Sequence, residues 1–136
     1  MKTRIALITI LTGDVPAMTR FYRDVLGFVV ETDMGEYVEF ASESVRFAVC
    51  ARSIMFEATG DDGFRRPAAG RSFELAFPCA SPAAVDEIYA EIVEQGATSI
   101  KEPADMPWGQ RTAFFADPDG NVHELFADLP DSEIPE

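Results

Sequence analysis

Glu124 is the first residue of the sequence whose type and position could do chemistry. It lies in the second arm of a predicted β-hairpin, in which the apolar runs 112–116 and 122–126 flank the turn sequence Asp117-Pro118-Asp119-Gly120-Asn121. Proline presets the second turn position, and glycine accepts the left-handed conformation that closes the turn. Side chains alternate along a strand, so Glu124 shares its face with apolar neighbours, where an ionised carboxylate needs a partner. Glu124 therefore either lies on an exposed strand face or binds or reacts with something.

Two other side chains near the hairpin could take part. His123 is the only histidine, and strand alternation turns it away from the face of Glu124, which favours a structural or solvent-facing role. Trp108 is the only tryptophan and precedes the hairpin. Its ring could stack on a planar or cationic ligand, or it could fill the edge of the core.

The composition limits the classes of partner. The 136 residues indicate one domain, 1–136, and a hydrophobic fraction of 47% is enough for a core. The net charge of −13 repels nucleic acid and anionic membranes and would attract a cationic ligand. No apolar run reaches the roughly 18 residues of a membrane span. The apolar run Ile5–Leu11 is too short for a signal peptide. We expect a cytoplasmic protein that binds neither nucleic acid nor membrane.

The elements that would hold these residues form a repeat. In the first half, Asp14 is typical of a helix cap, apolar residues follow at helical spacing, and Gly27 ends the pattern. The predicted strands of this half are Ile5–Leu11, Phe28–Thr32, Tyr37–Phe40 and Val45–Cys50. This order is β-α-β-β-β.

The same pattern returns in the second half. A strand, Phe73–Cys79, precedes a helix that Ser81 caps and Gly96 ends, and the strand Thr98–Ile100 and the hairpin follow. Tyr89 and Tyr22 are 67 residues apart (89 − 22 = 67), and the same offset relates several other apolar helix positions. The sequence therefore contains two copies of one unit.

The predicted fold is α+β. Two βαβββ repeats form an open, cup-shaped mixed β-sheet with the helices outside. Repeat one covers about 4–50, a connecting loop about 51–71, repeat two about 72–127, and an acidic tail 128–136, which we expect to fray. The connecting loop is either a binding lid or a mobile linker, and it could contain a helical turn.

Four features in this order resemble one known family. They are Asp14 before the helix sequence 21–28 (FYRDVLGF), the stretch 108–111 (WGQR), the hairpin 117–125, and the repeat itself. Together they resemble the glyoxalase / bleomycin-resistance / extradiol-dioxygenase superfamily, also called vicinal oxygen chelate proteins. The resemblance covers about residues 4–127. It implies the fold, but the family includes isomerases, dioxygenases, fosfomycin transferases and non-catalytic drug-binding proteins.

The resemblance also implies where a metal would bind. Enzymes of the family hold a divalent metal in the cup, and the last ligand corresponds to Glu124. The usual first-strand histidine corresponds to Leu7, and its counterpart in the second repeat to Glu74. A further glutamate on the fourth strand corresponds to Ala48 or Phe47. Transition metals of this family need imidazole ligands, so we predict no cofactor and no metal. A divalent metal is possible but disfavoured by Leu7 and Ala48.

Two functions remain open after this comparison. The first is a metal-independent small-molecule-binding protein that holds a cationic or polar-aromatic compound in the cup. The alternative is a glyoxalase-like lyase or isomerase, or a dioxygenase, with a degenerate metal site or with Glu74 and Glu124 as a catalytic acid–base pair. A third option is an interaction module without a ligand.

The predicted ligand-binding residues are Leu7, Ala48, Glu74, Trp108, Arg111 and Glu124. Arginine side chains could instead neutralise the two glutamates, which would leave only a structural role; the candidates are Arg46, Arg71 and Arg111. We also expect a homodimer, because the open sheets of this fold leave unpaired edges.

Overall fold

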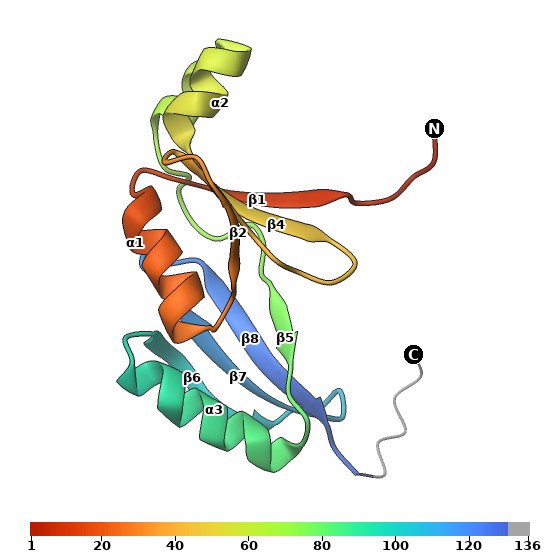
Figure 1. Ribbon diagram of the computed structural model, residues 1–136. Coiled ribbons are helices and arrows are strands. Elements are labelled where there is room, and N and C mark those ends of the chain that lie inside the picture. Colours follow the sequence, from red (N-terminus) through yellow and green to blue (C-terminus); the bar gives the residue numbers. More distant parts are fainter. Residues whose placement is uncertain (131–136) are drawn as a thin grey trace. The chain divides into compact units, whose positions relative to one another are not determined.

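The structure, a computed structural model, describes residues 1–130 (Figure 1). The chain divides into two compact units, Met1–Gly70 and Arg71–Glu136. Each unit contains one β-α-β-β-β repeat with its own four-stranded mixed sheet, so the predicted α+β class and the repeat are confirmed. Most of the predicted acidic tail 128–136 lies outside the described residues.

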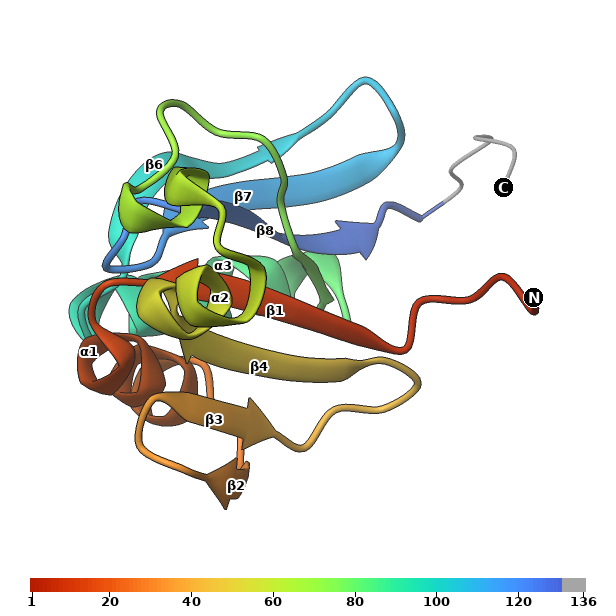
Figure 2. The same ribbon diagram turned by 90° about the horizontal axis from the view of Figure 1, so that it is seen from above.

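The first sheet has the strand order β1-β4-β3-β2 (Figure 2). Its strands are β1 (Leu7–Thr12), β2 (Val30–Asp33), β3 (Tyr37–Phe40) and β4 (Arg46–Ala51). β1 and β4 are parallel, and the other neighbours are antiparallel. β3 has the predicted bounds and the other three strands begin and end within two residues of theirs, because the alternation of apolar residues sets them.

One face of this sheet packs against a helix. α1 (Val15–Arg20) begins at Asp14, whose carboxylate accepts a hydrogen bond from the Ala17 amide, and a π-helical segment, η1 (Phe21–Val25), continues it. Tyr22 is fully buried and lies against Phe40 and Phe47. These aromatic side chains form the core of the first unit.

The segment 51–71 contains more regular structure than the sequence predicted. A two-turn helix, α2 (Arg52–Thr59), follows β4 directly and ends at Gly60 in the left-handed conformation, and a 3₁₀ turn, η2 (Asp62–Arg65), comes next. α2 has no side-chain N-cap and no fully buried residue. It therefore lacks the signals that mark a helix in a sequence.

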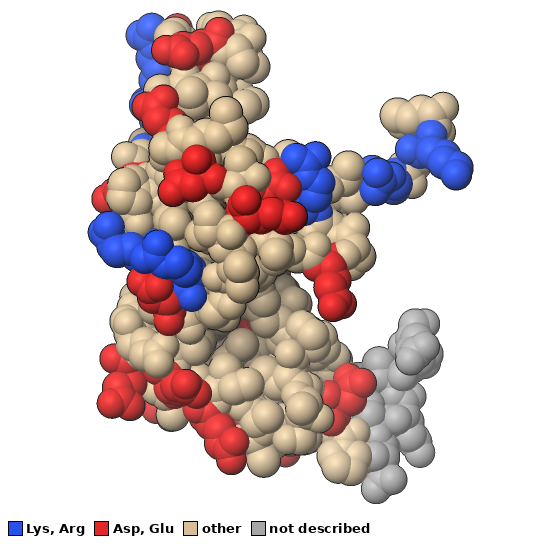
Figure 3. Space-filling model, viewed as in Figure 1, with Lys and Arg blue, Asp and Glu red and all other residues tan. Residues whose placement is uncertain are grey.

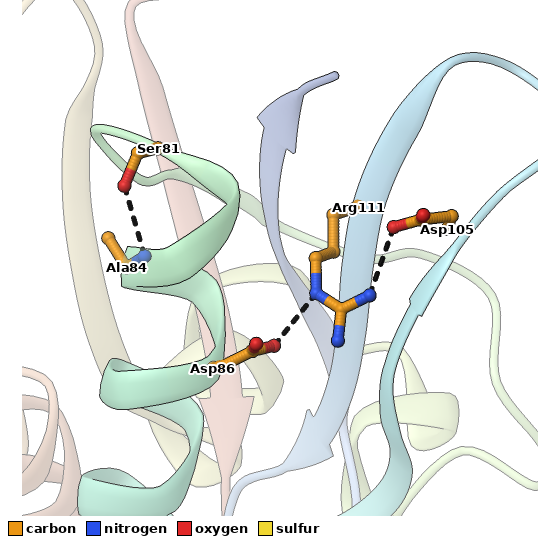
Figure 4. Close-up of polar contacts among 5 residues, drawn as sticks. All are labelled: Ser81, Ala84, Asp86, Asp105 and Arg111. Atoms are coloured by element: carbon orange, nitrogen blue, oxygen red, sulfur yellow. Dashed lines mark hydrogen bonds and ion pairs between the residues drawn. The ribbon is translucent and has the colours of Figure 1, made fainter. Parts of the chain in front are cut away.

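The second sheet has the order β5-β8-β7-β6. Its strands are β5 (Ala76–Pro78), β6 (Thr98–Asp105), β7 (Gln110–Ala116) and β8 (Val122–Asp128). β5 is shorter than the predicted strand Phe73–Cys79, and β6 is longer than the predicted Thr98–Ile100. α3 (Pro82–Glu94) begins at Ser81, whose hydroxyl accepts a hydrogen bond from the Ala84 amide (Figure 4).

The hairpin between β7 and β8 has the predicted turn. The Asp117 amide donates to the carbonyl of Asn121, and Gly120 has a φ of 84°. The buried carboxylate of Asp117 accepts hydrogen bonds from the backbone amides of Asp119 and Asn121, and these hydrogen bonds stabilise the conformation of the turn. This turn sets the register of β8 and with it the direction of Glu124.

The longest described helix is α3, with 13 residues. Within residues 1–130 no helix has the length and apolar character needed to cross a membrane.

Candidate functional site

Glu124 lies on the face of the second sheet that α3 does not cover. It pairs with Ala76 on β5 and with Phe114 on β7, and Phe126 follows two residues later on β8. Thr112 pairs with Phe126 and so shares this side. We call the surface formed by Ala76, Thr112, Phe114, Glu124 and Phe126 the Glu124 face. The half-buried carboxylate of Glu124 thus shares this face with two phenyl side chains, Phe114 and Phe126, that are also only partly buried.

The surroundings of Glu124 favour its neutral form. Burial raises the pKa of Glu124, and the negative charge of Glu74 raises it further. Glu74 itself is exposed and lies two residues before Ala76, in the extended segment that leads into β5. The structure thus brings the two predicted glutamates near one another, one half-buried and one in solvent.

The arginines that could have neutralised this pair are engaged elsewhere or form no ion pair with it. Arg111 lies on the opposite face of β7, and its guanidinium donates to Asp86 of α3 at 2.8 Å and to Asp105 of β6 at 2.9 Å (Figure 4). Arg46 binds Glu39 in the first unit. Among the described residues of the second unit, neither Glu74 nor Glu124 forms an ion pair with a lysine or arginine.

His123 is a core residue of the second unit and not part of the Glu124 face. Its side chain is fully buried against Phe77 and Phe115. Nδ1 accepts a hydrogen bond from the Leu75 amide at 3.0 Å, so the ring proton of the neutral form is on Nε2, which lies 3.7 Å from an Asp117 carboxylate oxygen. The structural role that the sequence favoured for His123 agrees with this position.

Two further residues complete the description of this unit. Trp108 lies in the turn between β6 and β7 and is 46% exposed, so its ring does not plug the core. The hydroxyl of Thr112, on the Glu124 face, is buried and has no hydrogen-bond partner in the described part of the chain. Phe114, Phe126 and Thr112 were not among the predicted site residues, although the alternation of β7 and β8 indicates their direction.

The predicted residues of the first unit share one side of its sheet. Leu7 pairs with Arg46, and Ala48 lies on the same side two residues after Arg46, away from α1. Neither Leu7 nor Ala48 offers a metal donor. The cross-strand neighbour of Ala48 is a carboxylate, Glu39, which the sequence analysis missed.

Both carboxylate oxygens of Glu39 accept hydrogen bonds from neighbouring side chains. Arg46 donates to both of its carboxylate oxygens, at 2.7 and 2.9 Å, and the Tyr37 hydroxyl donates to one of them at 2.7 Å. The hydrogen bonds from Arg46 and Tyr37 lower the pKa of Glu39 to about 2. Burial raises the pKa of Tyr37, and the hydrogen bond to Glu39 raises it further. Glu39 is therefore an ion-pair partner and not a spare metal ligand.

The donor groups do not fit a metal of the kind that the resemblance implies. Within either unit, the described residues offer no group of three histidine, cysteine, aspartate or glutamate side chains that could hold one ion. Among the residues that form the Glu124 face the one charged donor is Glu124, and the single histidine of the sequence is buried in the core. A site of this type needs at least three protein ligands, normally with an imidazole.

Comparisons with known proteins show the family of the chain. The sequence profile of the Glyoxalase/Bleomycin resistance protein/Dioxygenase superfamily matches residues 4–125. The chain belongs to this superfamily. The hairpin that carries Glu124 lies at the end of the matched region.

Individual relatives are similar in sequence or structure. The "Uncharacterized protein YraH" of Bacillus subtilis (strain 168) is 30% identical over 124 residues, which cover 88% of this chain and 94% of that protein. A glyoxalase/bleomycin resistance protein/dioxygenase from Nocardioides has a TM-score of 0.87 and 26% identity, covering 100% of this chain and 90% of its own. A glyoxalase/bleomycin resistance protein/dioxygenase family enzyme from Burkholderia phytofirmans has a TM-score of 0.82 and 25% identity. The match covers 91% of this chain and 98% of that enzyme. These relatives establish the family and the fold.

Proposed function

We propose that the protein binds a small cationic or polar-aromatic compound on the Glu124 face, without a metal. The observation that carries this proposal is the state of Glu124: half-buried beside its same-face neighbours Phe114 and Phe126, next to the charge of Glu74, and in no ion pair with a lysine or arginine of the described part of the second unit. Burying a carboxylate in this way is costly, and a ligand cation would offset that cost.

The chemistry of the face matches such a ligand. A cation beside Glu124 favours the ionised carboxylate, so binding opposes the effects of burial and of Glu74 on its pKa. Aromatic rings attract cations through their faces, and Glu124 shares its side of the sheet with Phe114, its cross-strand neighbour, and with Phe126, two residues along β8. Red carboxylate side chains are spread over the surface in Figure 3, consistent with a net charge of −13 that raises the local concentration of cations.

Calorimetric titration with benzyltrimethylammonium tests the proposal. We expect Glu124→Gln to weaken binding at least about 10-fold, which corresponds to ~1.4 kcal/mol. The neutral probe benzyl alcohol should bind both proteins equally weakly. The matched control is Glu102→Gln, which removes an exposed carboxylate from β6 and should leave the affinity unchanged. Equal affinity of the Glu124→Gln variant and the unaltered protein would refute the proposal.

Metal content provides a separate check. Protein purified without a chelator and without a metal-affinity tag should contain less than one equivalent of iron, zinc, nickel or manganese by elemental analysis. One equivalent that disappears in Glu124→Gln would show that the binding function depends on a metal after all.

The raised pKa of Glu124 also favours a second candidate, proton transfer by Glu124 in a lyase or isomerase reaction. A carboxyl group whose pKa is raised is a stronger base once ionised and a usable acid near neutral pH. The test follows exchange of the carbon-bound protons of hydroxyacetone for deuterium by NMR. Exchange that Glu124→Gln abolishes would favour the enzyme. In Glu74→Gln, the loss of one repulsive charge should shift the pH profile downwards.

A further inference from the structure

The first unit contains a groove that the proposed function does not use. It has a volume of about 400 Å³, which is within the usual range for small-ligand pockets. The end of β1, the turn between β2 and β3, the start of α2 and the η2 turn surround it. Its lining residues include Gly13, Glu36, Arg52, Phe56, Phe64 and Arg65.

Arg52 is the cation of this groove that has no carboxylate partner. Among the described residues of the first unit, no aspartate or glutamate forms an ion pair with it. Its guanidinium lies against Gly13, where an added Cβ would be only 2.6 Å from Nη2. Because Gly13 lacks a side chain, the guanidinium can rest on the backbone there, and its donors can face the groove.

The second cation, Arg65, is stacked on an aromatic wall. Its guanidinium carbon lies 4.0 Å from the centre of the Phe56 ring, and its Nε lies 3.3 Å from a carboxylate oxygen of Asp62. Phe64 provides a second aromatic side chain in the same groove. The groove thus contains both the guanidinium of Arg52, which has no carboxylate partner in its unit, and the phenyl rings of Phe56 and Phe64.

We propose that this groove binds a small aromatic carboxylate. A guanidinium and a carboxylate are both planar and can form two parallel hydrogen bonds, and the phenyl rings offer faces and edges for the ring of the ligand. Glu36 also lines the groove, and its charge opposes a dianion such as a phosphate ester more than a monoanion. The site is formed by residues of the first unit alone and shares no residue with the Glu124 face.

Calorimetric titration with benzoate, benzyl alcohol and phenyl phosphate tests this inference on the full chain. We expect benzoate to bind more tightly than benzyl alcohol or phenyl phosphate. Arg52→Gln should lower the affinity for benzoate at least about 10-fold. Gly13→Ala keeps the charges of Arg52 and Arg65 but displaces the guanidinium of Arg52, so it should also lower the affinity for benzoate. The control is Arg23→Gln, since Arg23 lies outside the groove and pairs with Asp24.

Amide NMR shifts on adding benzoate identify the place of binding and confirm that each variant is folded. They should concentrate at Thr12, Ser53 and Phe64, and Glu124→Gln should leave the benzoate affinity unchanged. The inference is overturned if Arg52→Gln binds benzoate within twofold of the unaltered protein, if phenyl phosphate binds as tightly as benzoate, or if the shifts concentrate on β7 and β8. Loss of cation binding by Glu124→Gln is a separate result, so the two proposals can fail independently.

Discussion

Two glutamates of this protein have opposite pKa shifts because only one of them has a cationic partner. Glu39 accepts hydrogen bonds from Arg46 and Tyr37, and its pKa falls to about 2. Glu124 is half-buried, has Glu74 near it and no such partner in the described chain, and its pKa rises. The first carboxylate is stabilised in its ionised form by the fold, whereas the surroundings of the second favour its neutral form.

The raised pKa of Glu124 should reduce stability at neutral pH. The folded protein keeps its proton at pH values where the unfolded chain has lost it, so stability is full below the unfolded pKa and falls as pH rises through the folded pKa. Glu124→Gln removes this dependence. Urea unfolding should show that the variant gains stability relative to the unaltered protein between pH 4 and 8. A constant difference across that range would contradict the assignment.

The lowered pKa of Glu39 should have the opposite effect. Its contribution to stability is present above the unfolded pKa, near the ordinary value of 4.5, and is lost as pH falls towards about 2. Glu39→Gln should therefore lower stability at pH 7 and flatten the loss of stability in acid. The control is Glu43→Gln, in the exposed loop before β4. Acid denaturation followed by circular dichroism compares the three proteins.

At the scale of elements, side-chain caps fix where the main helices begin. The Ser81 hydroxyl caps α3, the helix that covers one face of the second sheet. Ser81→Ala should destabilise the protein by about 1 kcal/mol, because the Ala84 amide loses its partner. Ser42→Ala, in an exposed loop, should change stability by less than about 0.5 kcal/mol. Equal unfolding midpoints for the two variants would argue against the cap.

The sequence predicted the elements better than their contacts. Caps, glycines and alternation are local signals, so the repeat, the hairpin and the direction of Glu124 followed from them. α2 was missed because it has neither a side-chain cap nor a fully buried residue. The ion pairs of Arg111 join β7 to α3 and β6, and such pairing depends on packing that no local pattern contains.

At the scale of the whole molecule, the acidic charge should make cation binding depend on salt. With a net charge of −13, the protein attracts cations over long distances. Salt weakens this attraction, because the screening length is only about 10 Å in 0.1 M salt. The affinity for benzyltrimethylammonium should therefore fall between 0.05 and 0.5 M salt, while that for benzyl alcohol should not. Equal salt dependence of the two probes would show that the charge does not contribute.

We also predict that the chain forms a homodimer. Both sheets are open, so β1 and β2 are edges of the first and β5 and β6 edges of the second. An edge strand presents unpaired backbone groups that favour association. β6 is the longest strand, most of its side chains are exposed, and Ile100 on it is 46% exposed. Closed two-fold pairing is the usual way in which such surfaces are covered.

Sedimentation equilibrium at micromolar concentration tests this prediction. We expect a species of about twice the 14.9 kDa of one chain. Ile100→Glu places a charge on the β6 edge and should shift the equilibrium towards the monomer if that edge is the interface, because a buried unpaired carboxylate is costly. Lys101→Glu, also exposed on β6, controls for added negative charge on the same strand. A clean monomer for the unaltered protein would rule out the dimer, whereas a dimer that resists Ile100→Glu would assign the interface to another edge.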